Sequence, residues 1–134
     1  MANPTEKDMK SWVDASRYDL ATARALLKSR RYLYVLFMCQ QAIEKMLKAC
    51  ATIKTGEFPP RIHNLARLAE LAVLDMTEEE RELLERLSLY YLQSRYPPEI
   101  QTLAKKVSRS IAASQLRQTE ALWRKLNKQL TRTK

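Results

Sequence analysis

Apolar residues recur every three to four positions along nearly the whole chain, the spacing that places them on one face of an α-helix. No run alternates apolar and polar residues between turn residues, as a half-buried strand would. The pattern predicts an all-α protein with about five helices, over about residues 5–29, 31–55, 64–74, 77–96 and 99–130. Because the connections are short, neighbouring helices should run antiparallel, giving an up-and-down helical bundle in one domain over residues 1–134.

Capping residues support the expected helix ends. We expect Asn3 to cap the first helix, with Pro4 at the first helical position and Glu6 completing a capping box. Gly56 should end the second helix, because glycine readily adopts the left-handed conformation found after a helix. Thr77 should cap the fourth helix, whose first turn carries three glutamates that the helix dipole favours.

The second helix is apolar on almost every side, which predicts a position at the centre of the bundle. Five polar residues interrupt it: Gln40, Gln41, Glu44, Lys45 and Lys48. Glu44 and Lys48 are four residues apart, in the order that favours an ion pair. Since buried polar groups need partners, these side chains either form an internal polar network or line a crevice or interface.

Composition excludes several classes of protein. The chain has one glycine, whereas a P-loop or a Rossmann turn needs several for close approach to phosphate. The longest run without a charged residue is the twelve residues from Tyr32 to Ile43, too short to cross a bilayer. Acidic Glu6 and Asp8 precede any apolar stretch, which argues against a signal peptide. We therefore expect a cytoplasmic protein that does not enter a membrane.

The residues that could bind metal or act as nucleophiles are few. Cys39 and Cys50 are eleven residues apart on one predicted helix, about 16 Å along its axis, and should be buried free thiols. His63 is the only histidine, so neither a di-iron pair of Glu-x-x-His motifs nor a close pair of zinc ligands can form. We expect no metal and no cofactor, and we expect His63 to cap the helix that follows it.

Positive charge is concentrated at the end of the chain. The formal net charge is +9, and residues 101–134 contribute nine basic residues against one acid, Glu120, a net of +8. The predicted basic helix over about residues 99–130 would attract a polyanion, either nucleic acid or an acidic partner protein. The alternative is a solvated helix face that only keeps the protein in solution.

A second unusual feature is the segment Tyr90–Pro98, where three tyrosines and Arg95 precede two prolines. An arginine flanked by aromatic rings suits a phosphate or a stacked base. The alternative is that Arg95 bonds only to the last carbonyls of its own helix. The candidate residues for nucleotide or nucleic-acid binding are Arg95, Tyr91, Lys45, Lys48, Lys105 and Arg109.

Residues 9–110 as a whole resemble the HEPN family of small all-α proteins. The resemblance is carried by Trp12, Asp19-Leu20 and Ala23, by Tyr34, Phe37, Gln40-Gln41-Ala42, Glu44-Lys45 and Leu47-Lys48-Ala49, by His63-Asn64-Leu65, and by Arg95-Tyr96-Pro97. It implies a prokaryotic helical bundle that forms a homodimer, often with a minimal nucleotidyltransferase as its partner. It also implies a role in toxin–antitoxin pairs, in which some members are metal-independent ribonucleases.

The ribonucleases of the family carry an arginine followed four to six residues later by a histidine. The residues at those distances from Arg95 are Glu99, Ile100 and Gln101, so the usual acid–base residue is missing. We therefore assign no catalytic residue. The sequence favours a non-catalytic HEPN-like module that binds nucleotide, RNA or a nucleotidyltransferase; the alternative is a ribonuclease of the same fold with a degenerate active site.

Overall fold

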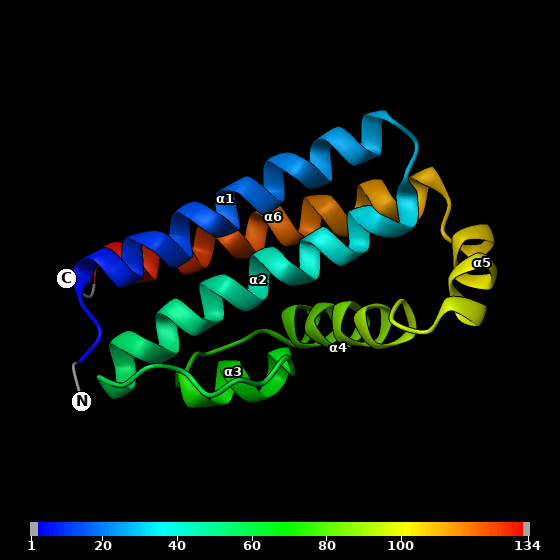
Figure 1. Cartoon of the computed structure of the whole chain (residues 1–134). Coiled ribbons are helices and arrows are strands. Elements are labelled where there is room, and N and C mark those ends of the chain that lie inside the picture. Colours follow the sequence, from blue (N-terminus) through cyan, green and yellow to red (C-terminus); the bar gives the residue numbers. More distant parts are fainter. Residues whose placement is uncertain (1–2, 133–134) are drawn as a thin grey trace.

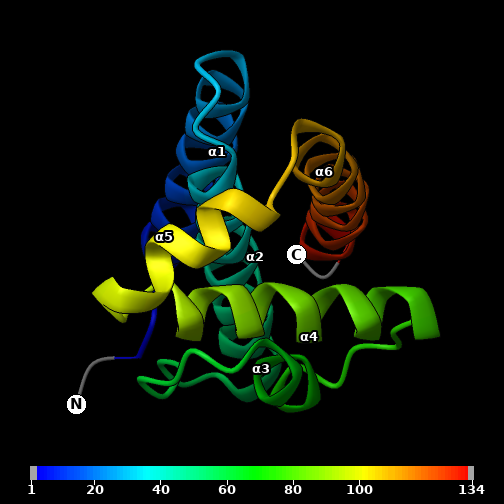
Figure 2. The same cartoon turned by 90° about the vertical axis from the view of Figure 1, so that its right-hand side faces the viewer.

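Six α-helices and no strand make up the part of the chain that the structure, a computed structural model, describes, residues 3–132 (Figure 1). In chain order they are α1 (Glu6–Lys28), α2 (Tyr32–Thr55), α3 (Leu65–Leu71), α4 (Glu78–Gln93), α5 (Pro97–Lys106) and α6 (Arg109–Arg132). The long helices α1, α2 and α6 form a bundle, while α3 and α4 pack on another side of α2. Figure 2 shows α4 running across the bundle, with α5 joining its C-terminal end to α6. The all-α prediction is confirmed.

The expected number of helices was wrong, because the predicted last helix is two helices. Val107 has an extended backbone (φ −90°, ψ 101°) that breaks the chain of helical hydrogen bonds between α5 and α6. The hydroxyl oxygen of Ser108 then accepts a hydrogen bond from the Ile111 backbone N–H, at 3.2 Å, and so caps α6. The apolar spacing continues through the break because the Val107 side chain is buried, which hid the interruption in the sequence.

The predicted caps differ in outcome. The first helix is capped by Thr5 and not by Asn3, since Thr5 exchanges hydrogen bonds with Asp8 in a reciprocal capping box. The expected capping box between Asn3 and Glu6 does not form, because α1 begins at Glu6 and Asp8 is therefore its third residue. Gly56 ends α2 in the left-handed conformation (φ 74°) and Thr77 caps α4, as predicted.

The core is centred on α2, as its apolar character predicted. This helix contacts every other helix of the bundle, and most of its side chains are buried. Its largest fully buried residues are Leu36, Ile43, Met46 and Leu47, which meet buried leucines of α3, α4 and α6. Burying side chains of this size contributes about 1.5–3 kcal/mol each, so this helix is the main source of stability.

Polar contacts tie α1 to α6 across the bundle. The indole N–H of Trp123 donates to the Ser16 hydroxyl at 2.8 Å, and both side chains are buried. Closer to the surface, Arg24 on α1 donates two hydrogen bonds to the carboxylate of Glu120 on α6. These contacts fix which face of α6 is turned inward and which faces solvent.

No helix among the described residues has the length and hydropathy required to cross a bilayer.

The cap at Ser108 gives a test of the break between α5 and α6. Replacing Ser108 with Ala removes the side-chain acceptor for the Ile111 N–H and should lower the free energy of unfolding by about 1 kcal/mol. The control is Ser110→Ala, in the first turn of α6, where alanine is at least as favourable as serine. Urea unfolding followed by circular dichroism measures both, and equal stability of the two variants would contradict the assigned cap.

Candidate functional site

The polar residues of α2 form an internal network centred on Glu44. Its carboxylate accepts hydrogen bonds from the Gln40 amide at 2.9 Å and from the Lys48 ammonium group at 3.2 Å. Gln41 donates in turn to the Gln40 carbonyl oxygen at 2.7 Å. Gln40 is fully buried, and the Glu44 and Lys48 side chains are only 8% and 10% exposed. Four of the five polar residues thus form an internal network, while the fifth, Lys45, pairs with Asp19 of α1 instead.

His63 joins this network from the loop before α3. Its ring nitrogen Nδ1 lies 2.9 Å from the Glu44 carboxylate, which can only accept when ionised, so we assign an N–H at Nδ1 that donates a hydrogen bond to the carboxylate. The prediction that His63 caps the next helix was wrong, because Asn64 fills that place and accepts from the Arg67 backbone N–H. Half of the His63 side chain is exposed. A buried carboxylate thus orients an imidazole that is half exposed to solvent.

Tyr91 lies in contact with both His63 and Arg95, one of the candidate binding residues. The His63 and Tyr91 ring centroids are 5.4 Å apart, and the Arg95 guanidinium carbon lies 5.7 Å from the Tyr91 centroid. Phe37 of α2 stacks on Tyr91 at 5.5 Å with nearly parallel rings, which holds the tyrosine in place. The Arg95 side chain is exposed and makes no hydrogen bond or ion pair within residues 3–132. We call Glu44, His63, Tyr91 and Arg95 the His63 site.

The two candidate lysines of α2 have carboxylate partners. Lys45 forms an ion pair with the mostly buried Asp19 of α1, which fastens α1 to α2. Lys48 is held by Glu44, and its ammonium group lies 5.8 Å from the Trp12 ring centroid. Both positive charges are therefore neutralised within the fold.

The remaining candidates, Lys105 and Arg109, lie near the junction of α5 and α6. Both are exposed, and within the described part of the chain neither has an ion pair. Of the six candidate residues, the structure brings only Tyr91 and Arg95 into contact with each other.

The His63 site includes residues that the sequence analysis had not assigned to binding. Glu44 and His63 are nineteen residues apart and meet only through the packing of the loop against α2. One signal was available: a lone histidine after two prolines is held in a rigid loop, and a carboxylate on a central helix needs a partner.

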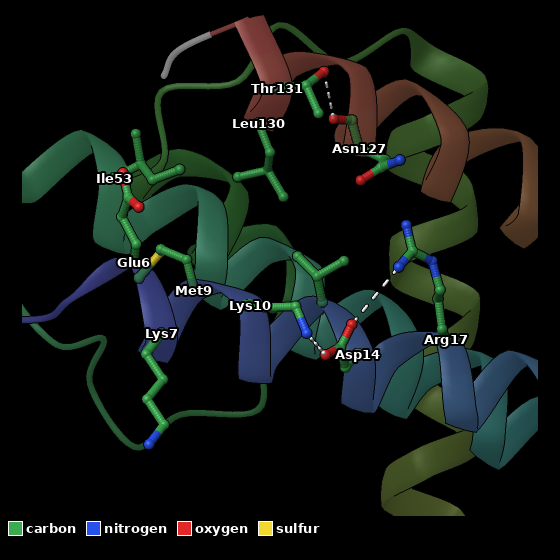
Figure 3. Close-up of a pocket in the computed structure, with 11 residues that line it drawn as sticks. Glu6, Lys7, Met9, Lys10, Asp14, Arg17, Ile53, Asn127, Leu130 and Thr131 are labelled. Atoms are coloured by element: carbon green, nitrogen blue, oxygen red, sulfur yellow. Dashed lines mark hydrogen bonds and ion pairs between the residues drawn. The ribbon is translucent and has the colours of Figure 1, made fainter.

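A separate cavity of about 460 Å³ lies between the start of α1, the end of α2 and the end of α6 (Figure 3). Met9, Val13, Ile53 and Leu130 provide its apolar surface. Asp14 stands at its edge between Lys10 and Arg17, and accepts from Lys10 at 3.2 Å. Asp14 also forms an ion pair with Arg17, at 3.6 Å. No histidine or cysteine lines this cavity, which lies apart from the His63 site.

Both cysteines are buried and free, as predicted. Burial raises the pKa of the Cys39 and Cys50 thiols to about 12, because the apolar interior disfavours the thiolate. In the described residues, no three histidine, cysteine or acidic side chains gather in a way that could hold a metal ion.

The network around Glu44 should be sensitive to loss of its charge. Glu44→Gln keeps the shape of the side chain but leaves the buried Lys48 ammonium group without a counter-charge, so it should lower the free energy of unfolding by about 3–5 kcal/mol. The double variant Glu44→Gln/Lys48→Met removes both charges and should recover most of that loss. Urea unfolding measures both, and a double variant no more stable than the single one would refute the assignment.

The cysteines should be inert while the protein is folded. At pH 8 a thiol with a pKa of about 12 has about one thiolate in ten thousand, so it reacts very slowly. We expect Ellman's reagent to modify no thiol in the native protein and two per chain in guanidinium chloride. Rapid reaction of either thiol in the native protein would contradict its burial.

Comparison with known proteins identifies the family. A family model described as the HEPN domain matches residues 9–129. Among solved structures, the chain is similar to the crystal structure of TT1696 from Thermus thermophilus, with a TM-score of 0.72 and 24% sequence identity over 90% of this chain and 96% of that chain. That likeness shows a shared fold. None of the curated proteins matches the chain. Because the family model covers nearly the whole chain, the protein belongs to the HEPN domain family.

Proposed function

We propose that this protein is a non-catalytic HEPN-type module that binds a phosphate group of RNA or of a nucleotide at the His63 site. The observation that carries the proposal is the state of Arg95: an exposed guanidinium held against the Tyr91 ring, with no carboxylate bound to it in the described residues. A fixed arginine with its donors open to solvent can bind a phosphate through two hydrogen bonds. The neighbouring His63 offers a second donor when it is protonated.

The same region supports association of two copies. Leu89 and Leu92 are exposed, and their spacing of three residues puts them on one side of the end of α4; Tyr96, in the turn that follows, is exposed as well. Exposed apolar groups in such a patch favour a protein–protein contact. A two-fold contact here would bring two copies of Arg95 near each other, so the binding unit that we propose is a homodimer.

A second candidate function, ribonuclease activity, is favoured by one specific observation. His63 and Arg95 both lie against the Tyr91 ring, and Glu44 holds the imidazole in a defined tautomer. An imidazole oriented by a carboxylate can move a proton to or from a ribose hydroxyl, while an arginine stabilises the charge on the phosphate. His63 would then supply in space the acid–base group that the sequence after Arg95 lacks. A nucleotidyltransferase partner and a toxin–antitoxin role remain expectations from the family resemblance.

Binding of a short nucleotide tests the proposal directly. A 5′-phosphorylated uridine trinucleotide is titrated into the protein by isothermal calorimetry at about 50 mM salt, where electrostatic contacts are strong. Arg95→Ala should weaken binding about tenfold or more, the loss of one charge-assisted contact. Lys28→Ala, an equal loss of charge at the exposed end of α1, should leave binding within about twofold. Binding that is unchanged by Arg95→Ala would rule out this site.

The two candidate functions separate in one further assay. Single-stranded RNA is incubated with the purified protein and a chelator, which removes metal-dependent contaminants. The binding module leaves the RNA intact. Cleavage that is lost in both Arg95→Ala and His63→Ala, with the fold retained, would instead establish the ribonuclease.

A further inference from the structure

The solvent-facing side of α6 carries four cations in a line. They are Arg117, Arg124, Lys128 and Arg132, all exposed, at spacings of seven, four and four residues. Because seven and four residues both return to nearly the same side of a helix, these side chains form one stripe about 22 Å long. We call these four residues the α6 stripe.

The charge of the α6 stripe is not neutralised by the fold. Glu120, the single acid of α6, is turned toward α1, where it accepts from Arg24 at 2.7 Å. On α4, Glu80 is bound by Lys125 on the flank of α6, at 2.7 Å. Within residues 3–132 none of the four stripe residues has an ion pair, whereas Lys45 and Lys48 on α2 both do.

The arrangement costs the helix some stability. Like charges four residues apart, as in Arg124, Lys128 and Arg132, destabilise a helix by a few tenths of a kcal/mol per pair. A face that served only solubility would gain more from alternating acids and bases. A row of cations without acids between them instead fits a ligand with repeated negative charges.

The shape of the surface also suits an extended strand. Cations four residues apart are about 6 Å apart along the axis, comparable to neighbouring phosphates on an extended single strand. Arg124 stands between two shallow recesses, of about 370 and 440 Å³. The first lies toward α1 and is bordered by Arg17, Trp123 and the Arg24–Glu120 ion pair, while the second continues along α6 past Ala121 to Arg132. These recesses leave room for sugars and bases on either side of a backbone that follows the stripe.

We infer that the α6 stripe is a docking surface for the phosphodiester backbone of single-stranded RNA, separate from the His63 site. The inference rests on the proposed function for the class of ligand but uses another surface. Lys125 places the C-terminal half of α6, with Arg124, Lys128 and Arg132, beside the start of α4, whereas Arg95 follows the end of α4, about 24 Å away along a helix of sixteen residues (Figure 2). Arg117 is nearer to the middle of α4, where Arg86 donates to Gln118. One strand bound along the stripe would therefore need extra length to reach Arg95.

The experiment measures binding of a labelled twenty-nucleotide oligouridylate by fluorescence anisotropy as a function of salt. Four phosphate contacts predict a slope of log K against log salt of about −3, which is a loss of about 50-fold between 50 and 200 mM salt. The stripe variant is Arg124→Glu/Lys128→Glu. The control is Lys28→Glu/Arg61→Glu, which reverses two exposed cations that do not belong to α6. Each double variant lowers the formal net charge by four, from +9 to +5.

The inference predicts that the stripe variant binds at least tenfold more weakly than the control, with a slope less steep by about 1.4, and that both variants keep the helical circular dichroism of the parent. Equal weakening of the two variants would overturn it, since binding would then depend only on net charge. Stripe-dependent binding of a polyglutamate peptide without binding of the oligonucleotide would also overturn it, in favour of an acidic protein. Arg95→Ala should retain the stripe-dependent binding of the long strand. The proposal for the His63 site and the inference for the α6 stripe can therefore fail independently of each other.

Discussion

Burial of the Glu44 carboxylate at the centre of α2 is the constraint on which the arrangement of the other polar groups depends. A charge so far from water requires donors on every open side, and Gln40, Lys48 and His63 supply them. These hydrogen bonds fix the side chains of Gln40 and Lys48 and hold the loop before α3 against α2. An apolar residue at position 44 would pack in the same bundle, but His63 would lose the carboxylate that accepts its hydrogen bond.

The consequence reaches the surface through aromatic packing. His63, held by Glu44, lies against Tyr91, and Phe37 of α2 stacks on the same ring. Tyr91 in turn supports the Arg95 guanidinium at the end of α4. A buried ionic group, an imidazole, a phenol and an arginine thus form a continuous series from the core to solvent. Arg17 also lies over a buried ring, that of Trp123, but it pairs with Asp14, whereas Arg95 has no carboxylate partner in the described residues.

Local chemistry explains what could be predicted from the sequence. Helix positions, the ends at Gly56 and Thr77, and the central place of α2 follow from spacing and capping within a few residues. The break at Ser108 was missed because the buried Val107 continues the apolar pattern while the backbone changes direction. Lys45 was assigned to binding because its partner, Asp19, is twenty-six residues away and on another helix. The exposed line of cations on α6 becomes visible only once Glu120 is seen to face α1.

The central claim is that the series from Glu44 to Arg95 presents a phosphate-binding group, and NMR spectroscopy tests it most directly. Titration of ¹⁵N-labelled protein with the uridine trinucleotide should shift the Arg95 side-chain N–H resonance and the His63 ring resonances together, in a saturable manner. The amide resonances of residues around the cavity between Met9 and Leu130 should not shift. Saturable shifts at that cavity, with Arg95 and His63 unmoved, would contradict the account.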